Sequence, residues 1–429
     1  MTVPGRLGFH LGATLVAKVN AMLGVTEHRE LVAATVHRKA AAVMALHEPV
    51  AVMASLEPVV LEAGQLAAIA AAMVDVMADV KAVSAAAIEA SHVAAKSLAS
   101  HYDTVLADLD GVIYEGSLPI AGAAEGILAL KKQGLKVGYV TNNSSRKTET
   151  IAEQLAGFGV QAEPDEIISS GQTGVELMQG MVQPGAKVLV VGGEGLRARV
   201  EDAGFELEQD SSGKPDAVIQ GFSPDLTWRQ LAEASFAIQR GAVWVATNSD
   251  WTIPQENGLA PGNGTMLAAV HTATGIFAKV AGKPEPAIYQ TALRVFDSKQ
   301  ALFVGDRLDT DILGANRASI DSALVLTGVS TRKDVLAAKK EERPNFIIES
   351  MLDLLEPYAE PKRTKHGFRC GDALVESLLD RIVVVEGDPT SVEALRAACS
   401  VIWNSEKHIS LLSVEPRLYQ DEKFSRDKN

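Results

Sequence analysis

Short apolar runs alternate with amphipathic stretches from Tyr102 to about residue 355. We interpret the apolar runs as strands, namely TVLADLD, KVGYVTNN, EIISS, KVLVVGG, AVIQGF, VWVATN and ALFVGD. Strands separated by helices in this way predict an α/β protein with a Rossmann-like parallel sheet. Several of the runs end in polar residues. Because ligands bind at the carboxyl ends of the strands in open parallel sheets, we expect a site there.

The two ends of the chain follow other patterns. Residues 1–97 are rich in Ala, Val, Met and His and contain one aromatic residue, Phe9. This composition predicts an Ala-rich, all-helical N-terminal extension. Near the other end, the charged, Pro-bearing stretch EPYAEPKRTKHGF is typical of a linker. Beyond it, the stretch DALVESLLDRIVVVEGDPTSVEALRAACSVIW predicts a helix, beginning with DALVESLLD, then a strand and a second helix, and leaves a final strand open. We therefore expect a small C-terminal α/β module at residues 366–415.

The overall composition is that of a globular protein with two or three domains. Its 429 residues are 47% hydrophobic and 22% charged, which is enough apolar material for a substantial core. A formal net charge of −14 argues against nucleic acid and anionic membranes as partners, because both are polyanions. Two cysteines are too few for a disulfide framework, and no eighteen consecutive residues are apolar. We therefore expect a cytoplasmic protein without a membrane span, and leave open whether it forms a homo-oligomer.

Two aspartates, Asp108 and Asp110, stand two positions apart at the end of the first apolar run. Side chains at such positions of an extended strand point to the same side, so both carboxylates can face one ligand. Two close carboxylates repel each other unless a cation compensates, and Mg²⁺ prefers oxygen ligands of this kind. By itself, however, the sequence Asp-x-Asp-Gly is more typical of a surface turn.

Three further motifs stand at predicted strand-to-helix junctions. Thr141 opens the polar turn TNNSSR, where a hydroxyl and backbone amides can bind phosphate oxygens. Lys283 precedes Pro284, a residue type favoured in the first turn of a helix, so we expect a cation at a helix start. Asp306 and Asp311 form a second acidic pair after another strand. Each motif has an ordinary structural explanation, but together they predict one phosphate and metal site.

The motifs DLDGVIYEG, TNNSSR, GKPEP and GDRLDTDI, in this order, resemble the haloacid dehalogenase superfamily of aspartate-nucleophile phosphatases. The resemblance covers about residues 101–355. It is strongest to the branch that includes 4-nitrophenyl phosphatase-like, phosphoglycolate and pyridoxal phosphate phosphatases. This branch carries a large α/β cap of the C2 type between the threonine and lysine motifs. The resemblance therefore implies a core at residues 98–180 and 279–357 and an inserted cap domain at residues 181–278.

The same resemblance implies a phosphatase mechanism. Asp108 is expected to attack phosphorus and form an aspartyl-phosphate, while Asp110 protonates the leaving group and later activates water. Transporting ATPases of the superfamily have threonine at the position of Asp110, so this residue indicates hydrolysis. Mg²⁺ is expected to be held by Asp108, the backbone carbonyl of Asp110, and Asp306.

Four further residues receive binding or supporting roles from the resemblance. Thr141 and Lys283 are expected to bind the oxygens of the transferring phosphoryl group. Asn142 adds a backbone contact to the phosphate. Asp311 is expected to orient either the metal shell or Lys283.

The substrate is expected to be a small phosphomonoester, with glycerol 3-phosphate preferred. This preference follows from the tail, because a core of this type with a short α/β tail resembles actinobacterial glycerol-3-phosphate phosphatases. Phosphoglycolate, pyridoxal phosphate and nucleotides are alternative substrates. A non-catalytic binding or scaffold protein with a vestigial site is an alternative of another class, although all four motifs keep competent residues.

Two features of the cap region leave further alternatives. Gly193, Gly195 and Ala198 have the G-x-G-x-x-A spacing of a dinucleotide-binding turn, although such turns are common in α/β domains. Asn263 is expected to cap a helix rather than line the substrate pocket. For Asp250, the choice between a pocket residue and a local structural role stays open.

Overall fold

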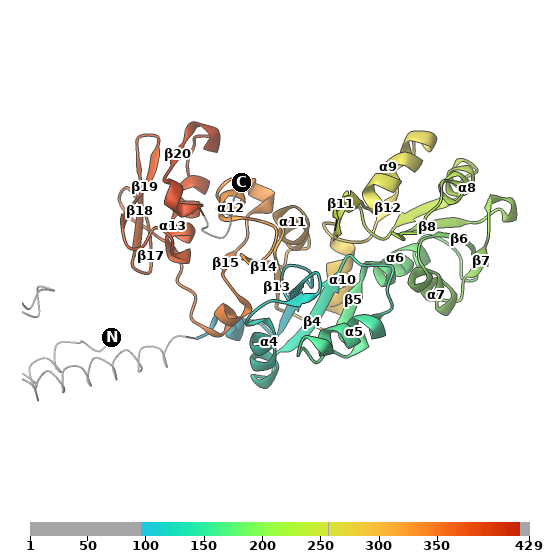
Figure 1. Ribbon diagram of the computed structural model, residues 1–429, viewed down its shortest axis with the longest axis horizontal. Helices are drawn as coiled ribbons and strands as arrows, with labels where there is room; N and C mark the ends of the chain where they lie inside the picture. Colours follow the sequence, from blue (N-terminus) through green and yellow to red (C-terminus); the bar gives the residue numbers. More distant parts are fainter. Residues whose placement is uncertain (1–95, 256, 421–429) are drawn as a thin grey trace, which may run out of the picture. The chain divides into compact units, whose positions relative to one another are not determined.

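The computed structural model describes residues 96–255 and 257–420. The predicted helical extension lies outside this part, apart from its last two residues, and so do residues 421–429. The described residues contain two parallel sheets accompanied by helices, and a five-stranded mixed sheet towards the C-terminus (Figure 1). The predicted α/β class with a Rossmann-like parallel core is confirmed.

The core sheet has the strand order β15–β14–β13–β1–β4–β5, and all neighbouring strands are parallel. Its strands are β1 (Thr104–Ala107), β4 (Lys136–Thr141), β5 (Ile167–Ser169), β13 (Ala301–Gly305), β14 (Asp321–Val325) and β15 (Phe346–Ile348). The helices that follow these strands and connect them are α4 (Ala123–Lys132), α5 (Thr148–Gly157), α6 (Ser170–Gln179), α10 (Pro286–Val295), α11 (Leu313–Arg317) and α12 (Arg332–Leu336). Strands β14 and β15 are not among the apolar runs predicted from the sequence; β14 begins with the polar residues Asp321 and Ser322.

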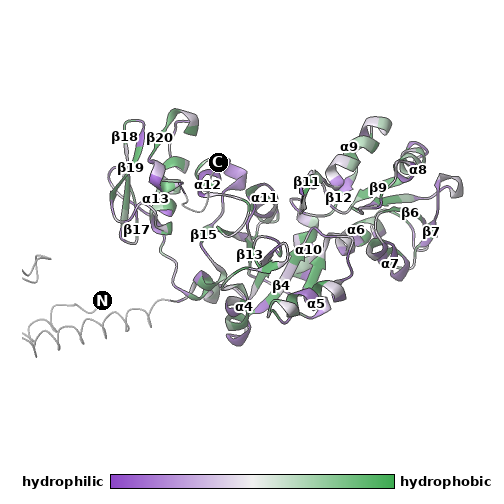
Figure 2. Cartoon of the chain, in the orientation of Figure 1, coloured by the Kyte–Doolittle hydropathy of each residue, from purple (hydrophilic) through white to green (hydrophobic). Residues whose placement is uncertain are grey.

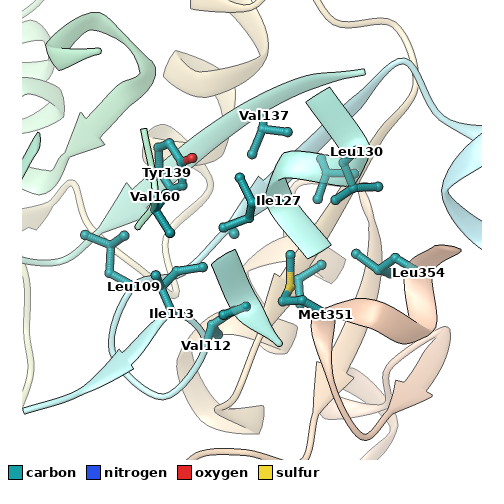
Figure 3. Close-up of a cluster of buried hydrophobic side chains, with 14 of the residues drawn as sticks. Leu109, Val112, Ile113, Ile127, Leu130, Val137, Tyr139, Val160, Met351 and Leu354 are labelled. Carbon is teal, nitrogen blue, oxygen red and sulfur yellow. The ribbon is translucent and has the colours of Figure 1, made fainter. Parts of the chain in front are cut away.

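Alternate side chains of the central strand β1 fill two different apolar clusters. Val105 and Ala107 belong to one cluster together with Ile127 of α4. Ile127 and other members of this cluster are labelled in Figure 3. Leu106, between them, belongs to another cluster with Tyr289 of α10. Successive side chains of a strand point to opposite faces, so a strand buried on both faces must be continuously apolar. This double burial fixes the end of β1, where Asp108 follows.

A short hairpin, β2 (Tyr114–Glu115) with β3 (Leu118–Pro119), follows β1. A second parallel sheet, in the order β12–β9–β8–β6–β7, lies between β5 and β13 in the chain. Its strands are β6 (Lys187–Val191), β7 (Glu206–Glu208), β8 (Ala217–Gln220), β9 (Val243–Ala246) and β12 (Lys279–Val280). The helices of this region are α7 (Glu194–Asp202), α8 (Trp228–Gln239) and α9 (Asn263–Thr274). A separate hairpin consists of β10 (Thr252–Gln255) and β11 (Gly258–Pro261). The last strand, β12, lies just beyond the predicted cap boundary at residue 278. We refer to this second sheet with its helices and hairpin as the cap.

The C-terminal module corrects one sequence expectation. Its sheet contains β16 (Lys362–Arg363), β17 (Gly367–Cys370), β18 (Ala373–Leu378), β19 (Arg381–Glu386) and β20 (Ser413–Val414), and it packs against α13 (Val392–Trp403). The stretch DALVESLLD, expected to be a helix, forms β18. Ala373 and Val375 are buried while Leu374 and Glu376 are partly exposed, which is the two-residue period of a strand. Pairing with β17 and β19 decides this structure.

Apolar residues are concentrated in the strands of the parallel sheets, whereas the helices mix apolar and polar residues (Figure 2). This distribution is typical of helices that pack one face on a sheet. The helices of the described residues include none that is long and apolar enough to cross a membrane.

Candidate active site

Three neighbouring strands deliver acidic and hydroxyl side chains to one edge of the core sheet. Asp108 follows β1, Thr141 ends β4, and Asp306 follows β13. Because β13, β1 and β4 are adjacent and parallel, their carboxyl ends meet at this edge. Lys283 arrives from the segment between β12 and α10. The structure thus brings together residues that are up to 198 positions apart, from Asp108 to Asp306.

Lys283 is the centre of the site. Its ammonium Nζ lies 2.7 Å from Asp108 Oδ1 and 2.7 Å from Asp311 Oδ1. The Lys283 side chain is 3% exposed and that of Asp311 is fully buried. The Nζ atom also lies 5.8 Å from the centre of the Phe303 ring. Buried charges are stable only when they are paired, so these contacts define the position of the ammonium group.

Three carboxylates crowd around this lysine. One oxygen atom from each of Asp108, Asp306 and Asp311 lies within 4.8 Å of the others. Asp306 Oδ2 accepts a hydrogen bond of 2.6 Å from the backbone N–H of Val329. Asp306 Oδ1 is buried and has no hydrogen-bond partner among the described residues. Three carboxylates and one ammonium leave a net negative site with a free oxygen ligand, which fits a hard divalent cation such as Mg²⁺.

The pKa values reflect this crowding. Burial, together with the charge of Asp311, raises the pKa of Asp306 to about 7. Burial also raises the pKa of Asp108 well above its usual value, and the contact with Lys283 opposes this effect. For Lys283, burial alone would lower the pKa, but the charges of Asp108 and Asp311 raise it above its usual value. The lysine therefore stays protonated at neutral pH.

Asp110 lies at the open side of the site. It is solvent-accessible, yet loss of surrounding water still raises its pKa above the usual value, with Lys283 acting in the opposite direction. The hydroxyl of Tyr114, in β2, donates a hydrogen bond of 3.5 Å to Asp110 Oδ2. A carboxyl group with a raised pKa that is open to solvent is suited to give and take a proton.

The turn after β4 is held by its own side chains. Thr141 Oγ1 accepts a hydrogen bond of 3.1 Å from the backbone N–H of Asn143. Asn143 Oδ1 in turn accepts from the backbone N–H groups of Ser145 and Arg146. The Thr141 hydroxyl is buried, and none of the described residues accepts its hydrogen. That hydrogen is therefore available to a ligand oxygen.

The Asn142 side chain braces the site. Its Oδ1 accepts a hydrogen bond of 2.8 Å from the backbone N–H of Lys283. Its Nδ2 donates to the backbone carbonyl of Lys283 at 3.1 Å and to Asp250 Oδ1 at 3.0 Å. From the sequence, only a backbone contact to phosphate is expected of Asn142, and the role of Asp250 stays open. Local sequence carries no signal for this link, because the partners are far apart in the chain.

Two expectations about helix starts need correction. Helix α10 begins at Pro286 with Glu285 as its capping residue, so Pro284, expected in the first turn, precedes the helix and Lys283 lies three positions before its start. Helix α9 begins at Asn263, and its capping position is Gly262. The buried Asn263 side chain instead donates a hydrogen bond of 2.7 Å to the backbone carbonyl of Asn248. The Asn263 amide therefore makes a tertiary hydrogen bond and does not cap the helix.

The glycines of the cap turn have a packing explanation. A Cβ atom at Gly195 would lie 2.6 Å from the backbone oxygen of Ser145, in the turn after β4. A Cβ atom at Gly193 would lie 3.4 Å from Ser145 Cβ. Helix α7 can approach this turn closely because Gly195 lacks a side chain. Close packing thus accounts for Gly195 without a dinucleotide, whereas a Cβ at Gly193 would be in ordinary van der Waals contact.

Comparison with known proteins places this chain in a family. A model of haloacid dehalogenase-like hydrolases matches residues 105–206, and a model described as HAD-hydrolase-like matches residues 280–354. A D-glycerol 3-phosphate phosphatase of Mycobacterium tuberculosis is 44% identical over 252 residues, which are 59% of this chain and 70% of that protein. The chain belongs to the haloacid dehalogenase-like hydrolases. The prediction of a phosphatase of this superfamily is confirmed.

Other members of the haloacid dehalogenase-like hydrolases show the same similarity. An acid sugar phosphatase of Staphylococcus aureus is 36% identical over 261 residues, 60% of this chain and 98% of that protein. A crystal structure of a glycerol phosphate phosphatase from M. tuberculosis in complex with magnesium has a TM-score of 0.68 and 36% identity, covering 76% of this chain and 96% of that one. A thermostable NPPase from Geobacillus stearothermophilus has a TM-score of 0.55 and 35% identity, covering 59% and 97%.

Proposed function

We propose that this phosphatase hydrolyses glycerol 3-phosphate, with Mg²⁺ as cofactor and Asp108 as nucleophile. The position of Lys283 Nζ, 2.7 Å from both Asp108 and Asp311, is the observation that carries the catalytic part of the proposal. The substrate part is supported by two comparisons, one of sequence and one of structure, each of which matches a glycerol phosphate phosphatase from M. tuberculosis.

Asp108, Asp306 and the backbone carbonyl of Asp110 would hold the Mg²⁺ ion. The unpartnered, buried Oδ1 atom of Asp306 supports its assignment as a ligand. When bound, the cation offsets the repulsion between the phosphate and the carboxylates. Asp311 stays paired with Lys283 and accepts a hydrogen bond of 3.1 Å from the backbone N–H of Arg307, so we assign it to orienting the lysine.

In the first step, a carboxylate oxygen of Asp108 attacks phosphorus, and the bond from phosphorus to the ester oxygen breaks. Asp108 must be ionised for this attack, although burial raises its pKa. The ammonium of Lys283 favours the ionised form through its contact of 2.7 Å. A backbone hydrogen bond of 2.7 Å, from Leu109 N–H to Asp108 Oδ1, further fixes the carboxylate. The product of this step is an aspartyl-phosphate on Asp108 and a free alcohol.

Asp110 transfers protons in both steps. In its protonated form it gives a proton to the departing alkoxide. It then removes a proton from the water that attacks the aspartyl-phosphate, which releases phosphate and regenerates the Asp108 carboxylate. Its raised pKa and its solvent access support this assignment. The Tyr114 hydroxyl holds one of its oxygens in place.

Three groups would bind the oxygens of the transferring phosphoryl group. They are the Lys283 ammonium, the Thr141 hydroxyl and the backbone N–H of Asn142. The Asn142 N–H has no hydrogen-bond partner within residues 96–255 and 257–420. Charge and hydrogen-bond donors fixed before the reaction lower the barrier because they need no reorganisation.

Hydrolysis of a substrate panel tests the proposal. Steady-state rates on glycerol 3-phosphate, phosphoglycolate, pyridoxal 5′-phosphate and nucleoside monophosphates would be measured with Mg²⁺ and after chelation. We expect the highest kcat/KM on glycerol 3-phosphate, and loss of activity with EDTA. A higher kcat/KM on another phosphomonoester would replace the substrate and leave the mechanism standing. Failure to turn over any phosphomonoester would favour the scaffold alternative.

We also propose that the protein acts in the cytoplasm on a small anionic metabolite. The net charge of −14 supports a small substrate over a polyanionic partner. Both cysteines, Cys370 and Cys399, are buried free thiols, which suits a reducing compartment. Fractionation of cells with an antibody to the chain would test the location.

A further inference from the structure

We propose that Asp250 is a positioning residue of the phosphatase reaction, which holds Lys283 in place through Asn142. This inference rests on the proposed role of Lys283. It concerns a cap residue, in the segment between β9 and β10, whose side chain makes one hydrogen bond with the described residues, to Asn142 in the turn after β4.

Every polar atom of the Asn142 carboxamide is engaged in hydrogen bonds. Its side-chain oxygen accepts from Lys283 N–H, and its side-chain nitrogen donates to both Lys283 O and Asp250 Oδ1. Its backbone carbonyl accepts from Ser170 Oγ at 2.6 Å and from Asn248 Nδ2 at 2.8 Å. A carboxamide nitrogen has two hydrogens, so the contacts to Lys283 and Asp250 use both. Removing Asp250 would leave one of them without its partner.

Asp250 is itself held in place by hydrogen bonds within the cap. Its N–H donates to Asn248 Oδ1 at 3.3 Å, and its carbonyl accepts from Gly264 N–H at 2.9 Å. A Cβ atom at Gly262 would lie 2.2 Å from the Asp250 carbonyl oxygen, so the chain packs tightly here. Asn142 is the only residue of the described chain to which the Asp250 side chain is hydrogen-bonded. The Asp250 carboxylate is therefore held in a fixed position, where it accepts a hydrogen bond from Asn142.

The backbone of Lys283 depends on the Asn142 carboxamide for its hydrogen bonds. Gly282 N–H donates to Thr247 O at 2.7 Å, which ties the preceding residue to the cap. Both backbone polar groups of Lys283 itself bind the Asn142 carboxamide. A rotation of that carboxamide would release both, and the ammonium would move away from Asp108. Displacements of about 1 Å can cost about a hundredfold in rate when a group acts at the reacting centre.

The consequence is a dependence of catalysis on the cap. Asp250 belongs to the cap, whereas Asn142 and Asp108 belong to the core. The hydrogen bond of 3.0 Å between Asp250 and Asn142 exists only when the cap segment lies against the core turn. In this arrangement the Asn142 carboxamide holds the Lys283 backbone in position. When the cap segment moves away from the turn, Asn142 loses its hydrogen bond to Asp250 and Lys283 becomes more mobile.

A double-mutant cycle tests the proposal with 4-nitrophenyl phosphate as probe substrate. The proteins are wild type, Asp250→Ala, Asn142→Ala, the double variant and Asp250→Asn. We expect Asp250→Ala to lower kcat by about 10- to 100-fold, as for other partners that orient an active group, and to change KM by less than about threefold. The double variant should be no slower than Asn142→Ala, because both changes break the same link. Asp250→Asn keeps an oxygen acceptor, so its kcat should stay within about threefold of wild type.

Asp225→Asn is the matched control, since this cap carboxylate is exposed and makes no side-chain hydrogen bond or ion pair with the described residues. It should leave kcat unchanged. Wild-type kcat in Asp250→Ala would overturn the proposal, as would fully additive losses in the cycle. An Asp250→Asn variant as slow as Asp250→Ala would also overturn it, even if Asp250→Ala folds poorly. Absence of turnover in the wild type would instead refute the proposed function, so the two failures are distinguishable.

Discussion

The Lys283 ammonium lies 2.7 Å from the carboxylate of Asp108, in a site where a third and a fourth charge, those of Asp306 and Asp311, are also buried. One cation among three carboxylates leaves an excess of negative charge that the protein alone does not neutralise. The site therefore gains stability from any further cation, and loses it when the lysine is removed. Four predictions follow from this charge arrangement and from the packing around it.

Replacing the nucleophile should separate activity from stability. Asp108→Asn removes the attacking oxygen, so we expect hydrolysis to fall by at least about a thousandfold. The variant also relieves repulsion among the carboxylates, so its thermal midpoint should not be lower than that of wild type. Activity assays and thermal unfolding of the same preparation measure both. Retained turnover in the variant would refute the nucleophile assignment.

Removing the lysine should lower both the activity and the stability of the protein. Lys283→Met leaves Asp108 and Asp311 without their partner, and breaking a buried ion pair in this way typically costs about 3–5 kcal/mol. We expect a loss of that order in chemical denaturation without metal. Mg²⁺ should restore part of the stability but not the activity. If the variant and the wild type had the same free energy of unfolding without Mg²⁺, the carboxylates would not be ionised at the same time.

The stability of the metal-free protein should depend on Asp306. Burial raises the pKa of Asp306 to about 7 in the folded state, above its value of 3.8 in a model peptide. The folded protein therefore binds this proton more tightly than the unfolded chain does. The resulting stabilisation is complete below pH 3.8 and disappears as the pH rises through about 7. Thermal midpoints measured between these values, with and without EDTA, should show this decline without metal.

Asp306→Asn is the control for this pH effect. The amide does not titrate, so the decline should be smaller in the variant. Mg²⁺ should stabilise the wild type more as the pH rises through the same range, because protons compete with the metal for the carboxylate. Identical pH profiles for the variant and wild type without metal would contradict the raised pKa of Asp306.

Close packing of the cap on the turn after β4 should require Gly195. The Cβ atom of Gly195→Ala would lie 2.6 Å from Ser145 O, so helix α7 must shift. We expect a loss of about 1–3 kcal/mol in stability, together with lower kcat, because the shift disturbs the turn that holds Thr141. Gly157→Ala is the matched control: this glycine lies in α5, and its Cβ would meet nothing within 4 Å. It should be neutral or slightly stabilising. Equal effects of the two substitutions would show that the cap tolerates the shift.

Four of the six core strands, β1, β4, β5 and β13, and the principal site residues could be predicted because they depend on local sequence. A strand buried on both faces is largely apolar, as β13 is and as β1 is after Thr104, and the polar residue that follows the apolar run marks the carboxyl end of the strand. Asp108, Thr141 and Asp306 each occupy such a position. In a parallel sheet these ends lie at the same edge, so three local patterns also predict a meeting point.

Other features had no local signal. The stretch that forms β18 contains good helix formers, and only its pairing with two neighbouring strands makes it extended. Asn142 and Asp250 are 108 residues apart, and neither has a neighbour in sequence that would predict their hydrogen bond. Likewise, nothing near Gly195 in sequence indicates that the Ser145 backbone will lie against it.

The sequence by itself thus determined which chemical groups stand at the ends of which strands, since burial and periodicity act over a few residues. The tertiary structure decided where the lysine ammonium points, which amide braces it and how the cap touches the turn. Those outcomes depend on distances between segments brought together by packing, which the identity of neighbouring residues does not encode.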